Sequence, residues 1–318
     1  MIEVDKNNPL VSVCIPMYNA SLYVEETMQR IKDQTYNNIE VIIVDDGSSD
    51  RSVEIVSSFL SNNIKLYHNP SKGANAARNY AFEKSSGDYI KFMDADDYCS
   101  IKLIEKQVDM LQKQGTETSF VFSPLKMLFP NGDIVSPRRG IDKDYDPAIG
   151  LLIDIWNGLG FNCPLCHLMP RKLVTLSGGW DETILKNQDG EYFARLYNKA
   201  DKALSLTEEY VVWRQTGTGV SSVLSSKAIE SVLTTYDIII GIILQYNNDI
   251  QHKEICEKYV GNFVYENYIY DSNLYNKVHV ILKKYDLSFR LPNRKVLSLL
   301  RKLLGWKQSV KLIHKYNL

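Results

Sequence analysis

The sequence predicts an α/β fold: a doubly wound, mostly parallel sheet flanked by helices, with a helical extension at the C-terminus. Strand-like and helix-like segments alternate about every 25 residues over roughly the first 125 positions. Polar clusters follow several of the strand-like segments, and the pattern is helical from Lys227 onward. We therefore expect one domain over residues 1–225 and a helical region over residues 226–318.

Composition narrows the class of protein. The chain has 318 residues, 44% of them hydrophobic, and a formal net charge of −1, which gives no support for nucleic acid as a partner. Its five cysteines are scattered, and its polar start lacks the apolar core of a signal peptide. A reduced, cytoplasmic setting is expected. The longest apolar run, residues 238–244, is far shorter than the ~20 residues of a membrane span.

The predicted strands are short and rich in β-branched or aromatic residues. They span residues 11–15, 39–44, 64–68, 89–93 and 120–122. The helices between them are expected at about residues 22–33, 50–60, 74–85 and 101–114. Pro16 should end the first strand, because proline cannot continue a ladder. Leu22 should face the core, and Ser48 or Ser49 should cap the second helix.

Three polar clusters follow strands of this sheet: Tyr18-Asn19, Asp45-Asp46 and Asp94–Asp97. Ligands of doubly wound sheets bind outside the carboxyl ends of the strands, so the clusters predict a site at that edge. The carboxylates of Asp94–Asp97 repel one another unless a hard divalent cation lies between them. The alternative is a solvated acidic turn, with Asp97 beginning the next helix. No phosphate-binding glycine fingerprint is present, which disfavours dinucleotide enzymes and the usual ATPases.

The middle of the chain is less regular. Cys163-Pro-Leu-Cys-His167 matches the haem c attachment pattern, but without an export signal we expect buried cysteines on a strand instead. Asp189 lies where a helix should begin, a position that favours a carboxylate through the helix dipole. The alternative is that Asp189 is only a helix cap.

The C-terminal tail is basic. After Asp286 it carries eight Lys or Arg residues and no acid. Its apolar residues are predicted to share one helical face: Val296, Leu299, Leu300, Leu303, Trp306, Val310 and Ile313. A basic amphipathic helix over residues 290–318 suits the inner face of a membrane, and the alternative is a terminal helix packed on its own domain. A homodimer through the C-terminal helices is a further expectation.

Several segments in order resemble the family 2 glycosyltransferases, which have the GT-A fold. The resemblance covers about residues 9–225 and rests on these pieces: Val11–Asn19, Gln34–Tyr36, Val44–Asp50, Gly73–Asn79, Asp94–Asp97, Gly178–Asp181 and Gln188-Asp189. Each piece alone is weak, but their order and spacing together are specific.

The resemblance implies a role for each site residue. On the donor side it implies Pro16, Tyr18 and Asp46 around the nucleobase, Arg78 near the phosphates, and Asp94 and Asp96 at the sugar and at Mn²⁺ or Mg²⁺. Asn19 and Gly73 are also implied to bind the donor. It also implies that Asp189 is the general base, with Trp180, Asp181 and Gln188 toward the acceptor. Two departures stand out: Gln188 replaces the Glu of many relatives, and Thr216 stands where many have a metal-serving His.

The resemblance implies an inverting, metal-dependent enzyme. It would move a sugar from a nucleotide-sugar donor, expected to be a UDP-sugar, to a hydroxyl of a glycan or lipid-linked acceptor of a bacterial surface polysaccharide. One carboxylate base and one direct displacement invert the anomeric centre. The alternatives are a sugar-phosphate nucleotidyltransferase and a catalytically silent nucleotide-sugar-binding module.

Overall fold

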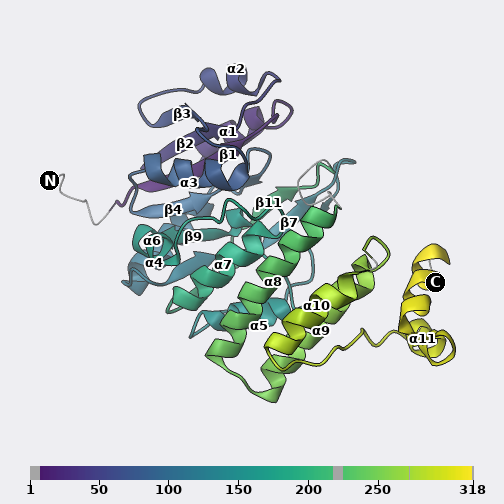
Figure 1. Cartoon of the computed structure of the whole chain (residues 1–318). Helices are drawn as coiled ribbons and strands as arrows, with labels where there is room; N and C mark the ends of the chain where they lie inside the picture. Colours follow the sequence, from purple (N-terminus) through teal and green to yellow (C-terminus); the bar gives the residue numbers. More distant parts are fainter. Residues whose placement is uncertain (1–7, 218–224, 272, 317–318) are drawn as a thin grey trace. The chain divides into compact units, whose positions relative to one another are not determined.

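The computed structural model describes residues 8–217, 225–271 and 273–316 (Figure 1). The chain divides into two units. Unit 1 takes the described residues of Met1–Leu152, Leu159–Thr183 and Tyr192–Gly217. Unit 2 takes those of Ile153–Gly158, Ile184–Glu191 and Thr218–Leu318. Two short segments that precede residue 226 thus join the helical unit.

The main sheet of unit 1 has seven strands in the order β10-β6-β9-β4-β1-β2-β3. Their bounds are β1 Val11–Met17, β2 Ile39–Asp45, β3 Ile64–His68, β4 Tyr89–Phe92, β6 Phe120–Phe122, β9 His167–Pro170 and β10 Ala203–Ser205. The pairs among β1 to β4 are parallel, and so is β10 with β6, whereas β9 runs antiparallel to both β4 and β6. The predicted doubly wound, mostly parallel sheet is confirmed.

Helices flank this sheet, as the alternation predicted. They are α1 Val24–Lys32, α2 Ser52–Ser57, α3 Ala74–Lys84, α4 Leu103–Gln114 and α6 Arg171–Ser177. A smaller sheet has the order β5-β11-β7-β8. Its strands are β5 Tyr98–Cys99, β11 Val211–Arg214, β7 Leu125–Leu128 and β8 Ile134–Val135. Helices α5 (Ile149–Trp156) and α7 (Gln188–Lys199) have residues in both units.

Pro16 does not end β1, contrary to the prediction. The carbonyl of Met17 accepts a hydrogen bond from the Asp46 N–H on the β2 side, and the carbonyl of Cys14 accepts one from the Met93 N–H on the β4 side. Because strand residues alternate, Pro16 turns toward β4, and pairing with β4 stops at Cys14. The missing N–H of Pro16 therefore costs no ladder bond.

Two predictions about helix starts were also wrong. Leu22 precedes α1 and is 85% exposed, while Val24 and Met28 of α1 are fully buried. The next helix begins at Ser52, whose N–H donates to the Asp50 carboxylate, so neither Ser48 nor Ser49 caps it. In both places a turn with its own hydrogen bonds separates the strand from the helix, which periodicity does not reveal.

The cysteines are buried free thiols. Cys163 and Cys166 are buried as predicted, but they do not lie on a strand: Cys163 precedes a 3₁₀ turn (Pro164–Cys166), Cys166 ends it, and β9 begins only at His167. Their sulfur atoms lie 3.6 Å apart. The imidazole of His167 is buried against the hydroxyl of Tyr197, at 2.7 Å, so it has a structural partner.

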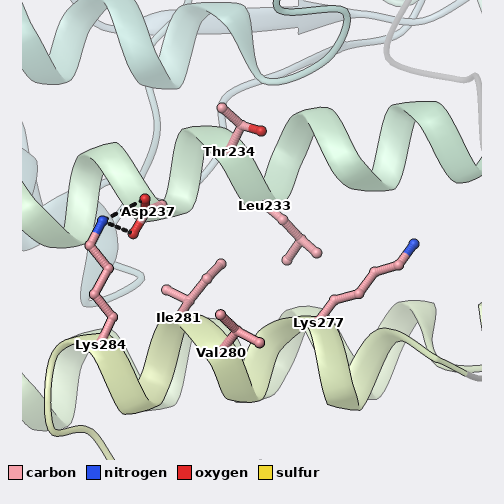
Figure 2. A pocket seen from close by; sticks show the side chains of 7 residues that line it. All are labelled: Leu233, Thr234, Asp237, Lys277, Val280, Ile281 and Lys284. Atoms are coloured by element: carbon pink, nitrogen blue, oxygen red, sulfur yellow. Dashed lines mark hydrogen bonds and ion pairs between the residues drawn. The ribbon is translucent and has the colours of Figure 1, made fainter.

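Unit 2 is built from α8 Ser226–Tyr246, α9 Ile250–Asn267, α10 Leu274–Lys284 and α11 Lys295–Tyr316. The ring of Trp156 stacks on Tyr259 at 4.3 Å and meets Tyr236 edge-on. Figure 2 shows a groove between α8 and α10 in which Lys284 forms an ion pair with Asp237 at 2.7 Å.

One described helix, α8, is long and apolar enough by length and composition to cross a membrane, although its longest uninterrupted apolar run is residues 238–244. The helix has 21 residues, and 61% of its most apolar 18-residue stretch is buried inside the protein. Ile239, Ile240 and Ile243 contribute to that buried surface. Packing within the protein thus accounts for much of its apolar character.

The tail is not one continuous amphipathic helix, contrary to the prediction. Gly305 has φ 71° and ψ 161°, which breaks α11 into two helices. Before the break Leu299 and Leu303 are 66% and 78% exposed, whereas after it Val310 and Ile313 are buried. The last two residues of the predicted tail lie outside the described residues.

Candidate functional site

The carboxyl edge of the main sheet brings the predicted polar clusters together. β1 lies between β2 and β4, and all three strands run in the same direction, so the residues that follow them share one edge. The side chain of Tyr18 is 62% exposed there. Asn19 has φ 49°, and its Oδ1 accepts a hydrogen bond from the Ser49 N–H at 2.8 Å. The β1 and β2 ends are thus tied to each other.

Asp46 holds the next part of the edge. Its carboxylate accepts hydrogen bonds from the Gly73 N–H, at 2.9 Å to Oδ2, and from the Asn69 side-chain amide, at 2.6 Å to Oδ1. Gly73 has φ 102°, a conformation that favours glycine. Asp46 therefore joins the end of β2 to the loop before α3. Nothing in the sequence pattern pointed to Asn69.

Arg78 and Asp94 form a half-buried ion pair. The Nη2 atom of Arg78 lies 2.8 Å from Oδ1 of Asp94, and their side chains are 6% and 33% exposed. The guanidinium carbon lies 4.6 Å from the centroid of the Trp180 ring, which stacks on Tyr192 at 4.1 Å. This pairing directs the charge of Arg78 onto Asp94.

Trp180 itself is 3% exposed. Its backbone N–H donates to Oδ1 of Asn79, and its carbonyl accepts from Nδ2 of the same residue. The Asp181 carbonyl accepts a hydrogen bond from the side-chain amide of Asn75. The pieces Gly73–Asn79 and Gly178–Asp181, which the sequence presented separately, therefore dock on each other.

Burial and neighbouring carboxylates both disfavour the charged forms of Asp96 and Asp97. Burial and the charge of Asp94 raise the pKa of Asp96 to about 6. Burial, with the charges of Asp96 and Asp94, also raises the pKa of Asp97 well above its usual value. A carboxylate cluster in this state favours the approach of a cation.

Arg214 anchors this acidic loop, a role that the sequence analysis missed. Its backbone N–H donates to Oδ1 of Asp97 at 2.9 Å, and its Nε–H donates to the carbonyl of Asp96 at 2.9 Å. Its Nη2 pairs with Glu26 of α1 at 2.8 Å. The available signal was an arginine directly after a strand-like run, in the segment already noted for Thr216.

Asp97 does not begin a helix, contrary to the prediction. Its side chain is 2% exposed and accepts from Arg214, and the next residues form β5 rather than a helix. The hydroxyl of Thr27 lies 2.9 Å from the Asp97 carbonyl. The carboxylate of Asp97 is thus used to join β11 to the loop.

The fit to a divalent cation rests on Asp96. Among the described residues, no group of three or more His, Cys, Asp or Glu side chains could hold a metal ion. Asp94 is engaged by Arg78, and Asp97 is engaged by Arg214. Asp96 remains as a partly exposed carboxylate with a raised pKa, which fits a cation that takes its other oxygen ligands from water and substrate phosphates.

Gln188 and Asp189 belong to unit 2, at the first turn of α7. The side-chain amide of Gln188 donates to the Ile184 carbonyl at 3.2 Å. The first turn of a helix favours a negative charge, so the position suits an ionised Asp189. In unit 1, Asp181 accepts hydrogen bonds from both the N–H and the hydroxyl of Thr183, which lower the pKa of its carboxyl.

A doubly wound sheet with carboxylates along its carboxyl edge is the architecture of GT-A glycosyltransferases. Residues 12–174, half of the chain, match the family model described as "Glycosyl transferase family 2". The chain belongs to that family.

Relatives with similar sequences are also glycosyltransferases by name. Over 240 residues the chain is 38% identical to the uncharacterized glycosyltransferase EpsJ of Bacillus subtilis, which covers 71% of this chain and 67% of EpsJ. It is 41% identical over 126 residues to an uncharacterized glycosyltransferase of Haemophilus influenzae, covering 38% of this chain and 50% of that protein. The chain therefore spans half the length of that relative, and 28% and 32% of two Rickettsia relatives.

A solved structure shares the fold. The structure of S. aureus TarS in complex with UDP-GlcNAc matches with a TM-score of 0.71 and 18% identity, covering 97% of this chain and 92% of that chain. A TarS structure in complex with UDP matches with a TM-score of 0.69 and 16% identity. At these identities the likeness shows the GT-A fold.

Proposed function

We propose that this protein is an inverting glycosyltransferase that moves a sugar from a UDP-sugar to a hydroxyl of a glycan or lipid-linked acceptor in surface polysaccharide synthesis. The observation that carries the proposal is the placement of three carboxylates, Asp46, Asp94 and Asp96, at one edge of the parallel sheet. Family membership supports glycosyl transfer, and the TarS complexes with UDP-GlcNAc and with UDP support a nucleotide-sugar donor.

The donor's nucleobase is assigned to the β1 and β2 ends. Pro16 and the exposed ring of Tyr18 offer a surface for the base, since aromatic rings stack on bases. The Asp46 carboxylate has lone pairs beyond those used by Asn69 and Gly73, so it has capacity to accept the imide N–H of uracil. Asn19 supports this end by holding Ser49 in place.

The diphosphate is assigned to Asp96 and its cation. Mn²⁺ or Mg²⁺ held by Asp96, with help from Asp94, would neutralise the charge that develops on the leaving diphosphate. We reassign Arg78 from direct phosphate contact to orienting Asp94, because it is buried and pairs with that carboxylate. Trp180, expected on the acceptor side, is reassigned to support of Arg78 for the same reason.

The transfer is a single displacement. The acceptor oxygen forms a bond to the anomeric carbon as the bond from that carbon to the diphosphate oxygen breaks, and the configuration inverts. The proton of the acceptor hydroxyl passes to the carboxylate of Asp189, and the electron pair of the broken bond leaves with UDP. Asp181 and Gln188 are assigned to the acceptor.

Release of UDP from candidate UDP-sugars in Mn²⁺ tests the proposal. We expect slow donor hydrolysis without acceptor, lost in Asp96→Ala and retained in the control Asp109→Ala, an exposed carboxylate on α4. Tight UDP binding with no turnover on any acceptor would instead identify a silent binding module. If Asp96→Ala hydrolyses the donor as fast as the control Asp109→Ala, Asp96 is not part of the site.

The exposed leucines of α11 favour a membrane surface as a partner. Leu299 and Leu303 are surrounded in the sequence by the exposed cations Arg301, Lys302 and Lys307, and no acid follows Asp286. Apolar side chains beside cations complement anionic lipids. These features support the proposal that the protein works in the cytoplasm at the inner face of the cell membrane, and its buried free thiols are compatible with a reducing cytoplasm.

Vesicle co-sedimentation tests this partner. Binding to vesicles with anionic lipid should fall in the double variant Leu299→Ser, Leu303→Ser and remain in the control Val280→Ser, an exposed apolar residue on α10. Neither of these two variants should bind to zwitterionic vesicles. If the leucine variant leaves vesicle binding unchanged but lowers the molar mass in solution, the face joins two copies of the chain instead.

A further inference from the structure

The segment that carries Asp189 is held by the helical unit. Ile184–Glu191 belongs to unit 2, although its neighbours in the chain on both sides belong to unit 1. Leu185, Lys186 and Asn187 of this segment make hydrogen bonds to two residues of α8, Ser231 and Thr235. We propose that Ser231 and Thr235 are positioning residues for Asp189, an inference that rests on the proposed role of Asp189 as the base.

Ser231 holds the backbone just before α7. Its Oγ accepts hydrogen bonds from the N–H groups of Leu185, at 2.9 Å, and Lys186, at 3.0 Å. The same hydroxyl donates to the Lys186 carbonyl at 3.3 Å. Ser231 is 9% exposed, so these bonds form in a largely water-free place. One hydroxyl therefore satisfies two consecutive backbone donors.

Thr235 holds the next residue, Asn187. The Thr235 hydroxyl donates to the Val232 carbonyl of its own helix at 2.7 Å, which turns its lone pairs outward. Nδ2 of Asn187 donates to that hydroxyl oxygen, also at 2.7 Å. Thr235 is fully buried. Because Ser231 and Thr235 are four residues apart on a helix, they lie on the same face and act on adjacent residues.

Asn187 connects these contacts to the first turn of α7. It has φ 63°, a left-handed conformation that asparagine tolerates better than most residues. Its carbonyl accepts a hydrogen bond from the Glu191 N–H at 3.2 Å, at the start of the helix. A Cβ at Gly190 would lie 2.5 Å from Oδ1 of Asn187, so the turn also requires glycine there. Asp189 lies between these two constrained residues.

Substitution of Thr235 by the isosteric Val tests the inference. We expect kcat of Thr235→Val to fall about 10- to 100-fold, because a small misplacement of a catalytic group is costly. The donor KM and the UDP affinity should stay at the wild-type values. Thr235→Ser, which keeps the hydroxyl, should restore kcat. The control is Thr234→Val, an adjacent threonine that lines the groove with α10 and bonds to Glu230 of its own helix (Figure 2).

Amide hydrogen exchange provides a readout that does not depend on activity. In Ser231→Ala, exchange at Leu185 and Lys186 should become faster, while α9 and α10 keep their protection. Unchanged exchange at these two amides would overturn the inference, whatever the activity.

Asp189→Asn separates the two proposals. If Asp189→Asn is inactive and Thr235→Val has wild-type kcat, the positioning role is wrong and the base remains. If Asp189→Asn has normal turnover, the base assignment is wrong, and the exchange at Leu185 and Lys186 still decides whether α8 holds the segment. If Thr235→Val loses UDP affinity and thermal stability together and Thr235→Ser restores neither, Thr235 acts only in packing, which overturns the inference.

Discussion

Residues 94–97 of unit 1 and residues 184–189 of unit 2 both carry carboxylates that we assign to the reaction, but different chemistry holds each segment. Arginines supply charged contacts to the first, beside the hydroxyl of Thr27: Arg78 pairs with Asp94, and Arg214 binds the backbone of Asp96. Neutral hydroxyls of Ser231 and Thr235 hold the second. Charge-assisted hydrogen bonds are roughly twice as strong as neutral ones, so they suit a loop whose own carboxylates repel one another.

The difference agrees with the proposed roles. A loop that binds a cation keeps several negative charges close together, and fixed positive charges offset part of that cost. A base needs a fixed orientation, and the hydroxyls of Ser231 and Thr235 hold the residues just before Asp189. Two predictions test this contrast directly, and a third, with the smallest expected effect, concerns the stability of the sheet that carries the first segment.

The largest effect is expected from Asp189→Asn. Turnover should fall by ~10²–10⁴-fold because the amide cannot accept the proton of the acceptor hydroxyl. UDP affinity measured by calorimetry should stay near the wild-type value, since the donor residues are unchanged. A parallel loss of UDP affinity would mean that Asp189 serves the donor, and the contrast between the two segments would fail.

An intermediate effect is expected from Arg214→Gln. This change removes the charged hydrogen bond to the Asp96 carbonyl, worth about 1.5–3 kcal/mol, so UDP affinity in Mn²⁺ should weaken about tenfold or more. Arg30 is the matched control, because it pairs with the same Glu26 but is 43% exposed. Arg30→Gln should change little. Equal losses in both variants would assign the effect to the charge near Glu26 and not to the loop.

The smallest effect concerns stability and comes from Glu40 on β2. Burial opposes its ionisation, but hydrogen bonds from Ser12, Ser86 and Gly87 outweigh burial and lower the pKa of its carboxyl. The stabilisation is therefore complete above the unfolded pKa of about 4.3 and is lost as the pH falls through the lower folded pKa.

Glu40→Gln should accordingly lower the free energy of unfolding by about 1–3 kcal/mol at pH 7, measured by urea denaturation. The gap between wild type and variant should narrow as the pH falls below about 4. Glu83→Gln, at a residue paired with Lys84 on the surface, is the control and should change the free energy little. A gap that stays constant with pH would show that Glu40 acts through packing.

The sequence by itself determined the parallel sheet, the helices around it and the edge at which the carboxylates gather. These follow from local periodicity and from the rule that parallel strands present their carboxyl ends on one side. Even so, Leu22 and Ser48 were misassigned, because irregular turns carry no period.

Only the tertiary structure decided which partners each carboxylate has. The contacts of Arg214 with Asp96 and of Thr235 with Asn187 join residues 118 and 48 positions apart, and side-chain hydrogen bonds at such separations leave no periodic signal in the chain. The same holds for Gly305, whose backbone conformation divides the basic tail into two helices. A glycine is compatible both with a continuous helix and with a break in it, so the sequence alone does not predict the break at Gly305.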